Sequence, residues 1–311
     1  MALIVYIAIY AGLLIFVIGC VRRIWQYAST PVHLRWELYP VPHEAPERVK
    51  HGGSYFETGD WWTKPQHSNH IGELRVMIPE ILFMKGLWEF NRRLWLPSFL
   101  FHFGLYLLIG AIVLVGLGAG FPLLAPSLAT SGFWIILAGV YHAMAYVGAT
   151  ISVAGALLLF LRRATDPALK NYTKPADFFN LVFFIIAFGL LAAGYFLRSP
   201  QSAGVGDVAR GLLRFDRTLH VSPLFGLGVV LSSALAAYIP FTHMSHFIAK
   251  YFTYHSVRWD DRPNVRGGSI ESAVAEYLTY RPTWSAAHVG ADGKRNWLDV
   301  ATTNPAQEVR K

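Results

Sequence analysis

Residues 94–161 decide the fold of this chain: LWLPSFLFHFGLYLLIGAIVLVGLGAGFPLLAPSLATSGFWIILAGVYHAMAYVGATISVAGALLLFL. The stretch contains no Asp, Glu, Lys or Arg. A bilayer core about 30 Å thick needs roughly 20 apolar residues of helix, so the stretch is too long for one span. Glycines, prolines and a serine between residues 118 and 127 interrupt it. The pattern therefore predicts two helices, over residues 96–117 and 133–161.

Three further apolar stretches have the length of a membrane helix. They are residues 2–21, which end at a pair of arginines, residues 178–197, and residues 223–247, where Pro223 suits the first turn of a helix. The composition agrees, since 54% of the residues are apolar and 15% charged, against about 25% charged in ordinary soluble domains. We expect an all-α membrane protein, a five transmembrane helix bundle with a cytoplasmic loop and a C-terminal tail.

The placement of lysine and arginine predicts the orientation. If the N-terminus lies outside, 23 of the 27 basic residues fall on the cytoplasmic side, and the other four are Arg198, Arg210, Arg214 and Arg217. The first span has no basic residue before it and no small-residue cleavage site, so we expect a retained anchor rather than a secretory signal. The net charge of +8 is thus a topology signal, and no nucleic-acid partner is expected.

Two polar segments, residues 22–93 and 250–311, are rich in Trp and Tyr. Aromatic residues in exposed segments are typical of docking surfaces, and packing on each other or on lipid headgroups is the alternative. A short helix is expected over residues 270–280. The single cysteine, Cys20, excludes a disulfide framework, a Cys-ligated zinc site and an iron–sulfur cluster held by this chain alone.

Histidines are the ionisable residues of the expected spans. Ionisable groups are costly in a membrane, so each is a functional candidate. Two neutral imidazoles from different helices clamp a b-type haem in a bundle, and small residues surround His102 and His142. A hydrogen-bonded structural role and a proton relay are the alternatives. The candidates in or beside the spans are His102, His142, His220, His243 and His246.

Depth favours two pairs of these histidines. At 1.5 Å per residue, His102 lies about 13 Å in from the cytoplasmic side, and His243 and His246 lie near the same face, which predicts an inner pair. His142 lies about 30 Å from that side, in the outer half, and His220 stands at the outer start of the fifth span. An outer pair of His142 and His220 is strained, because His220 counts as roughly 15 Å farther out.

The motifs around these residues resemble those of a known family. The segments LFHFG (residues 100–104), PADFFNL (175–181), RTLH (217–220) and PFTHMSH (240–246) resemble the gamma subunit family of respiratory nitrate reductases. The chain looks most similar to the branch that pairs with heterodisulfide-reductase-like iron–sulfur subunits. The resemblance implies a five-helix di-haem cytochrome b in the bacterial or archaeal cytoplasmic (inner) membrane, with its N-terminus outside and its C-terminus cytoplasmic.

The resemblance also implies roles for single residues. His102 matches the ligand on the second helix, His220 the outer ligand on the fifth helix and His246 the inner one, with His243 as the alternate to His246. The family pattern has a second histidine farther along helix two, where this chain has Ile112. His142 is taken as its substitute, which gives haem iron held by His102, His142, His220 and His246. Two haems b are expected, and one at the minimum.

Quinone chemistry is expected at the outer side. The loop of residues 198–220 supplies the candidates: Asp216 or His220 as proton acceptor, and Arg198 or Arg217 to polarise a quinone oxygen. Arginines that bind lipid phosphate or haem propionates are the alternative.

Four segments follow from these expectations. Residues 1–21 form the first span, 22–94 a cytoplasmic partner-docking segment, 95–249 a four-helix haem-binding core and 250–311 a cytoplasmic docking tail. The expected function is electron transfer between a quinone or menaquinone pool and a cytoplasmic iron–sulfur subunit, heterodisulfide-reductase-like or nitrate-reductase-beta-like. The alternative is a haem-free membrane anchor of a respiratory complex. A transporter is disfavoured, because no internal repeat is present.

Overall fold

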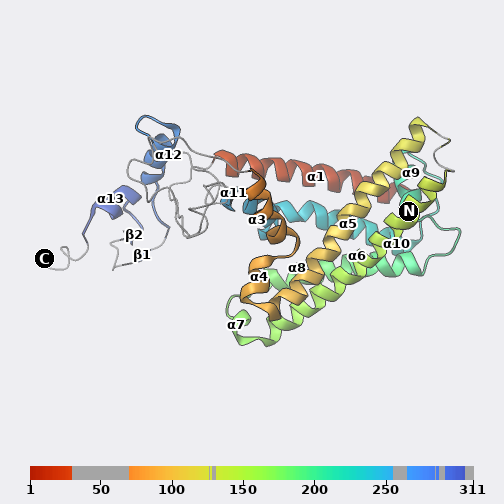
Figure 1. The fold of residues 1–311 in the computed structure, drawn as a ribbon, viewed down its shortest axis with the longest axis horizontal. Coiled ribbons are helices and arrows are strands. Elements are labelled where there is room, and N and C mark those ends of the chain that lie inside the picture. Colours follow the sequence, from red (N-terminus) through yellow and green to blue (C-terminus); the bar gives the residue numbers. More distant parts are fainter. Residues whose placement is uncertain are drawn as a thin grey trace. The chain divides into compact units, whose positions relative to one another are not determined.

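The structure is a computed structural model that describes residues 1–29, 70–125, 127, 131–254, 265–283, 285–286 and 291–304. The chain divides into two compact units, residues 1–20 with 77–245, and residues 21–76 with 246–311. The first unit is a bundle of long helices (Figure 1). Strand structure in the described residues is limited to a two-residue antiparallel pairing of β1 (Ser285–Ala286) with β2 (Ala291–Asp292). The expected all-α class is confirmed.

Five helices in the described part of the chain are long and apolar enough to cross a membrane, as the sequence predicts. The second is longer than predicted, because the glycines and Pro122 near residue 120 are accommodated inside the helix. The third extends a few residues beyond its predicted end, to Thr165. The five are α1 (Ala2–Ser29), α5 (Arg92–Leu124), α6 (Gly132–Thr165), α8 (Pro175–Phe196) and α10 (Pro223–Tyr238).

Helices α5 and α6 pack antiparallel through small residues. A Cβ at Gly104 would meet the backbone nitrogen of Ser152 and the backbone oxygen of Gly148 at 2.5 and 2.6 Å. Farther along, a Cβ at Gly118 would lie 3.2 Å from the ring of Tyr141. Close backbone approach through small residues is how helices associate in membranes, where lipid offers no hydrophobic drive.

Aromatic side chains hold α8 between α6 and α10. The rings of Phe160 and Phe178 lie 5.0 Å apart near one end of the bundle, and those of Tyr146 and Phe196 lie 3.9 Å apart near the other. These two contacts show that α6 and α8 run antiparallel. The core between the helices is apolar and comprises Phe101, Leu108, Ala149, Ala156, Leu159, Leu181, Phe184, Ala187, Phe188 and Leu235.

Helix α1 runs beside α10 in the same direction. A Cβ at Gly226 would lie 2.8 Å from Met1, and one at Gly12 would lie 2.6 Å from the backbone oxygen of Ser233. The bundle thus has an end with the N-terminus and α9 (Val205–Arg214), here termed the α9 end, visible in Figure 1. The opposite end, with α7 (Pro167–Lys170), is termed the α7 end.

The segment between α8 and α10 is folded tightly onto α1. The hydroxyl of Tyr6 donates to the backbone oxygen of Asp216 at 2.9 Å, and that of Tyr10 donates to the oxygen of Leu212 at 3.0 Å. Phe215 ends α9 in the left-handed region, at φ 54°, and its ring stacks on Tyr10. This αL cap satisfies carbonyls of the last turn of α9.

The fifth long helix is shorter than the predicted range of residues 223–247. Helix α10 ends at Tyr238, and two 3₁₀ turns follow, η4 (Ile239–Phe241) and η5 (His243–Ser245). Pro240 lies in the first turn, and a proline lacks the N–H that continues an α-helix. Helix α11 (His246–Tyr254) begins afresh after these turns. His243 and His246 therefore lie beyond α10, and the span ends at Phe241.

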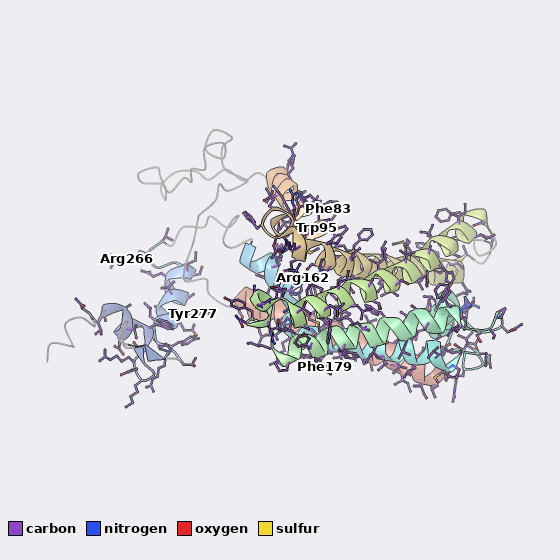
Figure 2. All side chains as sticks on the ribbon, turned by 90° about the horizontal axis from the view of Figure 1, so that it is seen from below. Phe83, Trp95, Arg162, Phe179, Arg266 and Tyr277 are labelled. Atoms are coloured by element: carbon purple, nitrogen blue, oxygen red, sulfur yellow. The ribbon has the colours of Figure 1, made fainter. Side chains whose placement is uncertain are left out.

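The polar segments contain short helices. Helix α3 (His70–Leu82) and helix α4 (Lys85–Phe90) precede α5, and neither is predicted by the sequence. Within the bundle unit, the indole Nε1 of Trp95 donates to the oxygen of Phe83 at 2.8 Å, and Figure 2 shows the two residues side by side. The tail contains α12 (Ser269–Leu278), close to the expected helix over 270–280, and α13 (Trp297–Thr302).

Candidate functional site

His102 is held in a defined tautomer on α5. Its Nδ1 lies 2.7 Å from the backbone oxygen of Ser98, one turn earlier. A carbonyl oxygen only accepts, so Nδ1 carries the proton and the lone pair of the ring lies on Nε2. Imidazoles that bind a metal through Nε2 have their other nitrogen fixed in this way. The half-buried His102 thus has the chemistry of an axial haem ligand.

His102 and His142 lie at two different levels of the bundle. Ser152 on α6 marks the level of His102, because its hydroxyl donates to the backbone oxygen of Phe101 at 3.3 Å. His142 lies ten residues before Ser152 on the same helix, which is about 15 Å toward the α9 end. The separation agrees with the depths expected from the sequence.

His142 is hydrogen-bonded to Tyr195 on α8. The phenol oxygen lies 2.8 Å from Nδ1, and the two rings are 5.6 Å apart. A phenol either donates or accepts, so this contact is compatible with both imidazole tautomers. When Nδ1 donates to Tyr195, the lone pair of the His142 ring lies on Nε2.

Arg198 completes a cluster at the α9 end, formed by His142, Tyr195, Arg198 and Gly204. The guanidinium carbon of Arg198 lies 4.4 Å from the ring centre of Tyr195, a favourable cation–π contact. Its Nε is buried and has no hydrogen-bond partner among the described residues. A Cβ at Gly204 would lie 3.3 Å from Arg198 and from Cε1 of His142. Asp207 fixes this loop by accepting from the backbone nitrogen of Gly204 at 2.9 Å.

His220 also lies at the α9 end, as expected. Its backbone oxygen accepts from the nitrogen of Ala203 at 2.8 Å, and Ala203 directly precedes Gly204 of the α9-end cluster. The imidazole of His220 is exposed. Its main chain is therefore fixed beside the cluster, while its side chain faces away from the packed core.

Asp216 has a structural role in the loop between α9 and α10. Its Oδ1 accepts from the hydroxyl of Thr218 at 2.6 Å and from the backbone nitrogen of Thr218 at 2.9 Å. These two bonds, the hydroxyl bond first, hold the pKa of Asp216 below its ordinary value. A carboxylate with a lowered pKa is a poor proton acceptor near neutral pH. Arg217, the third expected quinone-site residue, has an exposed side chain.

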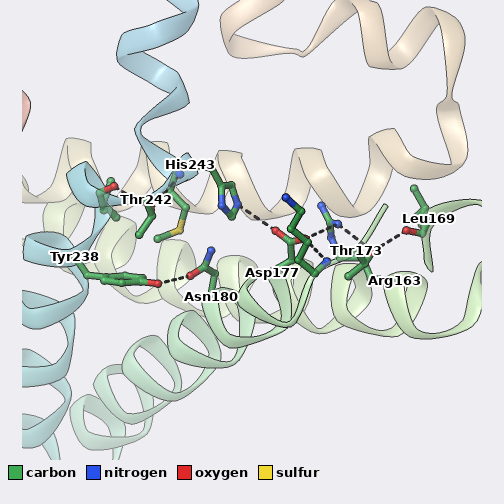
Figure 3. A network of polar contacts seen from close by, with 11 residues as sticks. Arg163, Leu169, Thr173, Asp177, Asn180, Tyr238, Thr242 and His243 are labelled. Atoms are coloured by element: carbon green, nitrogen blue, oxygen red, sulfur yellow. Dashed lines mark hydrogen bonds and ion pairs between the residues drawn. The ribbon is translucent and has the colours of Figure 1, made fainter. Parts of the chain in front are cut away.

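His243 is engaged by a carboxylate at the α7 end. Its Nε2 lies 3.3 Å from Oδ1 of Asp177 at the start of α8, and the side chain is 61% exposed. Arg163 lies 3.9 Å from the other oxygen of the same carboxylate. Figure 3 shows the ring of His243 turned toward Asp177. The Nε2 of His243 thus has a carboxylate partner in this structure.

His246 opens α11 and has an exposed side chain. It belongs to the second unit, whereas His102 belongs to the bundle unit. Groups of three or more His, Cys, Asp or Glu side chains placed to hold a metal ion do not occur among the residues that the structure describes.

Sequence reasoning missed Tyr195. A tyrosine in the last turn of an apolar helix is usually read as an interface anchor. The available signal was its spacing, since Arg198 follows three residues later and positions i and i+3 of a helix are neighbours. Only the tertiary structure shows that the partner of Tyr195 on α6 is His142.

The fold and these imidazoles define the class: an all-α integral membrane subunit with histidines at two levels of its bundle. The sequence profile of the nitrate reductase gamma subunit family matches residues 87–260, more than half of the chain, and the chain belongs to this family. The expectation from the motifs is thus confirmed.

One curated relative adds detail to the family match. The chain is 25% identical over 268 residues to the Hdr-like menaquinol oxidoreductase cytochrome b-like subunit of Archaeoglobus fulgidus, covering 78% of this chain and 76% of the relative. The relative belongs to the expected heterodisulfide-reductase-like branch. No solved structure matches the chain.

Proposed function

We propose that this chain is the membrane cytochrome b subunit of a quinone-linked oxidoreductase, carrying electrons between a menaquinol–menaquinone pool and an iron–sulfur partner. Family membership and the name of the relative support a membrane cytochrome b subunit of a menaquinol oxidoreductase. The observation that carries the proposal is the hydrogen bond from Nδ1 of His102 to Ser98, because it fixes the tautomer in which the lone pair of the ring lies on Nε2.

Two haems b are proposed, one at each level of the bundle. His102 and His246, with His243 as the alternate, serve the inner level, and His142 and His220 the outer one. A haem held there supplies a one-electron carrier inside the membrane. The chain's own task is to hold the imidazoles, to fix the tautomer of His102 through Ser98, to hydrogen-bond His142 through Tyr195, and to exclude water with the apolar core.

The α9-end cluster is proposed to bind the quinone headgroup. Two donors face this region: the hydroxyl of Tyr195, when its oxygen accepts from His142, and the unpartnered Nε–H of Arg198. Donors placed beside a quinone oxygen stabilise the negative charge that builds up on it. Arg198 is thus favoured over Asp216, which is engaged in its own turn.

The partner is proposed to be a cytoplasmic iron–sulfur subunit, heterodisulfide-reductase-like or nitrate-reductase-beta-like. The name of the relative and the family support this class of partner. Residues 21–76 and 246–311 form a compact unit of their own, and we propose this unit as the docking region.

Haem content tests the proposal most directly. We expect the purified wild-type protein to contain two haems b per chain, measured as the pyridine haemochrome. His102→Ala should lose one haem, while Phe103→Ala, at an exposed position on the same helix, should retain both. His246→Ala and His243→Ala, compared side by side, identify the second inner ligand.

A haem-free membrane anchor is the competing function, favoured by the hydrogen bond of His142 to Tyr195 and the ion pair of His243 with Asp177. A reduced-minus-oxidised spectrum without a b-type band would establish the anchor and refute the cytochrome. If only His220→Ala removes the outer haem and His142→Ala retains it, the assignment of His142 is wrong.

A further inference from the structure

The side-chain amide of Asn180, buried at the α7 end of the bundle, has one hydrogen-bonded atom and one atom without a partner among the described residues. The residue is 5% exposed. Its Oδ1 accepts from the hydroxyl of Tyr238 on α10 at 3.1 Å, and its Nδ2 is buried with no partner among the described residues. Turning the amide over exchanges the two atoms and still leaves one of them unpaired. Buried polar groups are nearly always hydrogen-bonded. The unpaired atom of this amide therefore indicates a position where a ligand atom would form a hydrogen bond.

The surroundings of the amide are aromatic and open toward the lipid. The ring of Tyr238 contacts Phe179 at 5.9 Å and Phe183 at 6.0 Å. Phe179 is 56% exposed on the surface of the bundle. Figure 3 shows the phenol of Tyr238 on α10 directed at Asn180 on α8. The phenol that bonds the amide therefore packs on aromatic rings, one of which is exposed at the surface of the bundle.

Charge restricts the ligand to a neutral acceptor. Asp177 precedes Asn180 by one turn on α8, and its carboxylate is only 16% exposed. Arg163 and His243 already pair with this carboxylate, so a second carboxylate beside it, such as a haem propionate, would compete with Asp177 for the same cations. A carbonyl oxygen accepts from Nδ2 without this competition. The ligand is therefore a lipid-soluble, planar molecule with a neutral carbonyl group.

We propose that Asn180 and Tyr238 form a second quinone-binding site, at the opposite end of the bundle from the α9-end cluster. Nδ2 of Asn180 donates to one quinone carbonyl, Tyr238 orients the amide, and Phe179 and Phe183 cover the ring. Few polar groups in an apolar, aromatic pocket are the usual composition of such sites. The inference rests on the proposed function only in taking a quinone as the ligand class.

Binding of menadione, a naphthoquinone headgroup without a tail, tests this site in the full-length protein in lipid nanodiscs. Equilibrium dialysis of the wild type should find two sites per chain. Asn180→Leu, which keeps the side-chain size, should weaken one site about tenfold, as expected for one lost hydrogen bond. Asn171→Leu, at the exposed end of α7, should change neither site.

A spectroscopic readout identifies the bond itself. With menadione labelled at its carbonyl carbons, one C=O band of the bound molecule should lie at lower frequency in the wild type than in Asn180→Leu. Tyr238→Phe should weaken the same site several-fold. This variant tests the proposed site if Asn180→Leu fails to insert into the membrane.

Two results overturn the inference: both menadione sites intact in Asn180→Leu, or a changed haem spectrum with unchanged menadione binding. The latter would assign the amide to a haem. Tyr195→Phe should weaken only the other site, so failure of the α9-end proposal is read separately from failure of this one.

Discussion

Three histidines of the bundle have three different polar partners, and the partner decides what each imidazole can do. The carbonyl of Ser98 fixes His102 with its lone pair on Nε2. The phenol of Tyr195 leaves the tautomer of His142 open. The carboxylate of Asp177 occupies Nε2 of His243. A histidine count from sequence treats these residues alike, whereas their chemistry differs through single neighbouring atoms.

Removal of the Arg198 guanidinium should weaken quinone binding at the α9 end. Arg198→Leu deletes the unpaired Nε donor and the cation over Tyr195, and a hydrogen bond from a charged donor contributes about 1.5–3 kcal/mol. We expect the affinity for menaquinol analogues to fall at least tenfold, measured by inhibition of haem reduction. Arg217→Leu, at an exposed position, is the matched control. Equal effects of the two substitutions would contradict the assignment.

The lowered pKa of Asp216 predicts a pH dependence of stability. A carboxyl whose pKa is lower in the folded than in the unfolded protein contributes stability above its unfolded value, and this contribution is lost as the pH falls through the folded value. Thr218→Val removes the hydroxyl donor and brings the pKa of Asp216 back toward its ordinary 3.8. Between about pH 6 and pH 3, Tm should therefore decline less in this variant than in the wild type.

Thr165→Val is the control for this pH experiment. Its hydroxyl donates to the backbone oxygen of Leu161, so the substitution involves no carboxylate. The wild-type decline of Tm should persist in it. A decline in Thr218→Val as steep as in the wild type would show that the hydroxyl does not set the pKa of Asp216.

At the scale of the elements, contact between α5 and α6 depends on residues without side chains. Gly104 faces backbone atoms of α6, and backbone cannot move aside as a flexible side chain does. A single residue also sets the length of α10, since Pro240 ends the α-helix before both His243 and His246. The fifth span is thereby shorter, and the histidines stand in a turn and at the start of a new helix.

A methyl group at Gly104 should destabilise the bundle. Gly104→Ala places Cβ within 2.5 to 2.6 Å of the α6 backbone, and overpacking of this kind costs about 1–3 kcal/mol. Gly116→Ala is a matched control on the same helix, because nothing lies within 4 Å of its Cβ. Thermal unfolding in detergent should show a lower Tm for the first variant only. Equal Tm values for the two variants would mean that α5 and α6 accommodate the methyl group at residue 104 without a loss of stability.

At the scale of the whole molecule, the chain combines an apolar bundle unit with a polar second unit. The family match of residues 87–260 covers four of the five spans and leaves α1 outside. Helix α1 is nonetheless packed into the bundle by Tyr6 and Tyr10, whose hydroxyls donate to the loop after α9 and to the last turn of α9, respectively. The first span is therefore part of the fold of the α9 end.

Orientation in the membrane is testable with single cysteines. In a Cys20→Ala background, which removes the only native thiol, Gln201→Cys places a thiol at the α9 end and Tyr172→Cys one at the α7 end, where Tyr172 is 85% exposed. With the N-terminus outside, a membrane-impermeant maleimide should label Gln201→Cys in intact cells and Tyr172→Cys only after lysis. The reverse pattern would invert the proposed topology.

The sequence by itself determined the membrane class, the five spans and the family, because long apolar runs and local motifs are properties of neighbouring residues. It also placed His102 and His142 at different depths, since helical rise is constant. Only the tertiary structure decided that Tyr195 meets His142, that Asp177 meets His243 and that Asn180 faces Tyr238. These pairs lie 53 to 66 residues apart in the chain, and hydropathy carries no information about which polar groups of different helices meet.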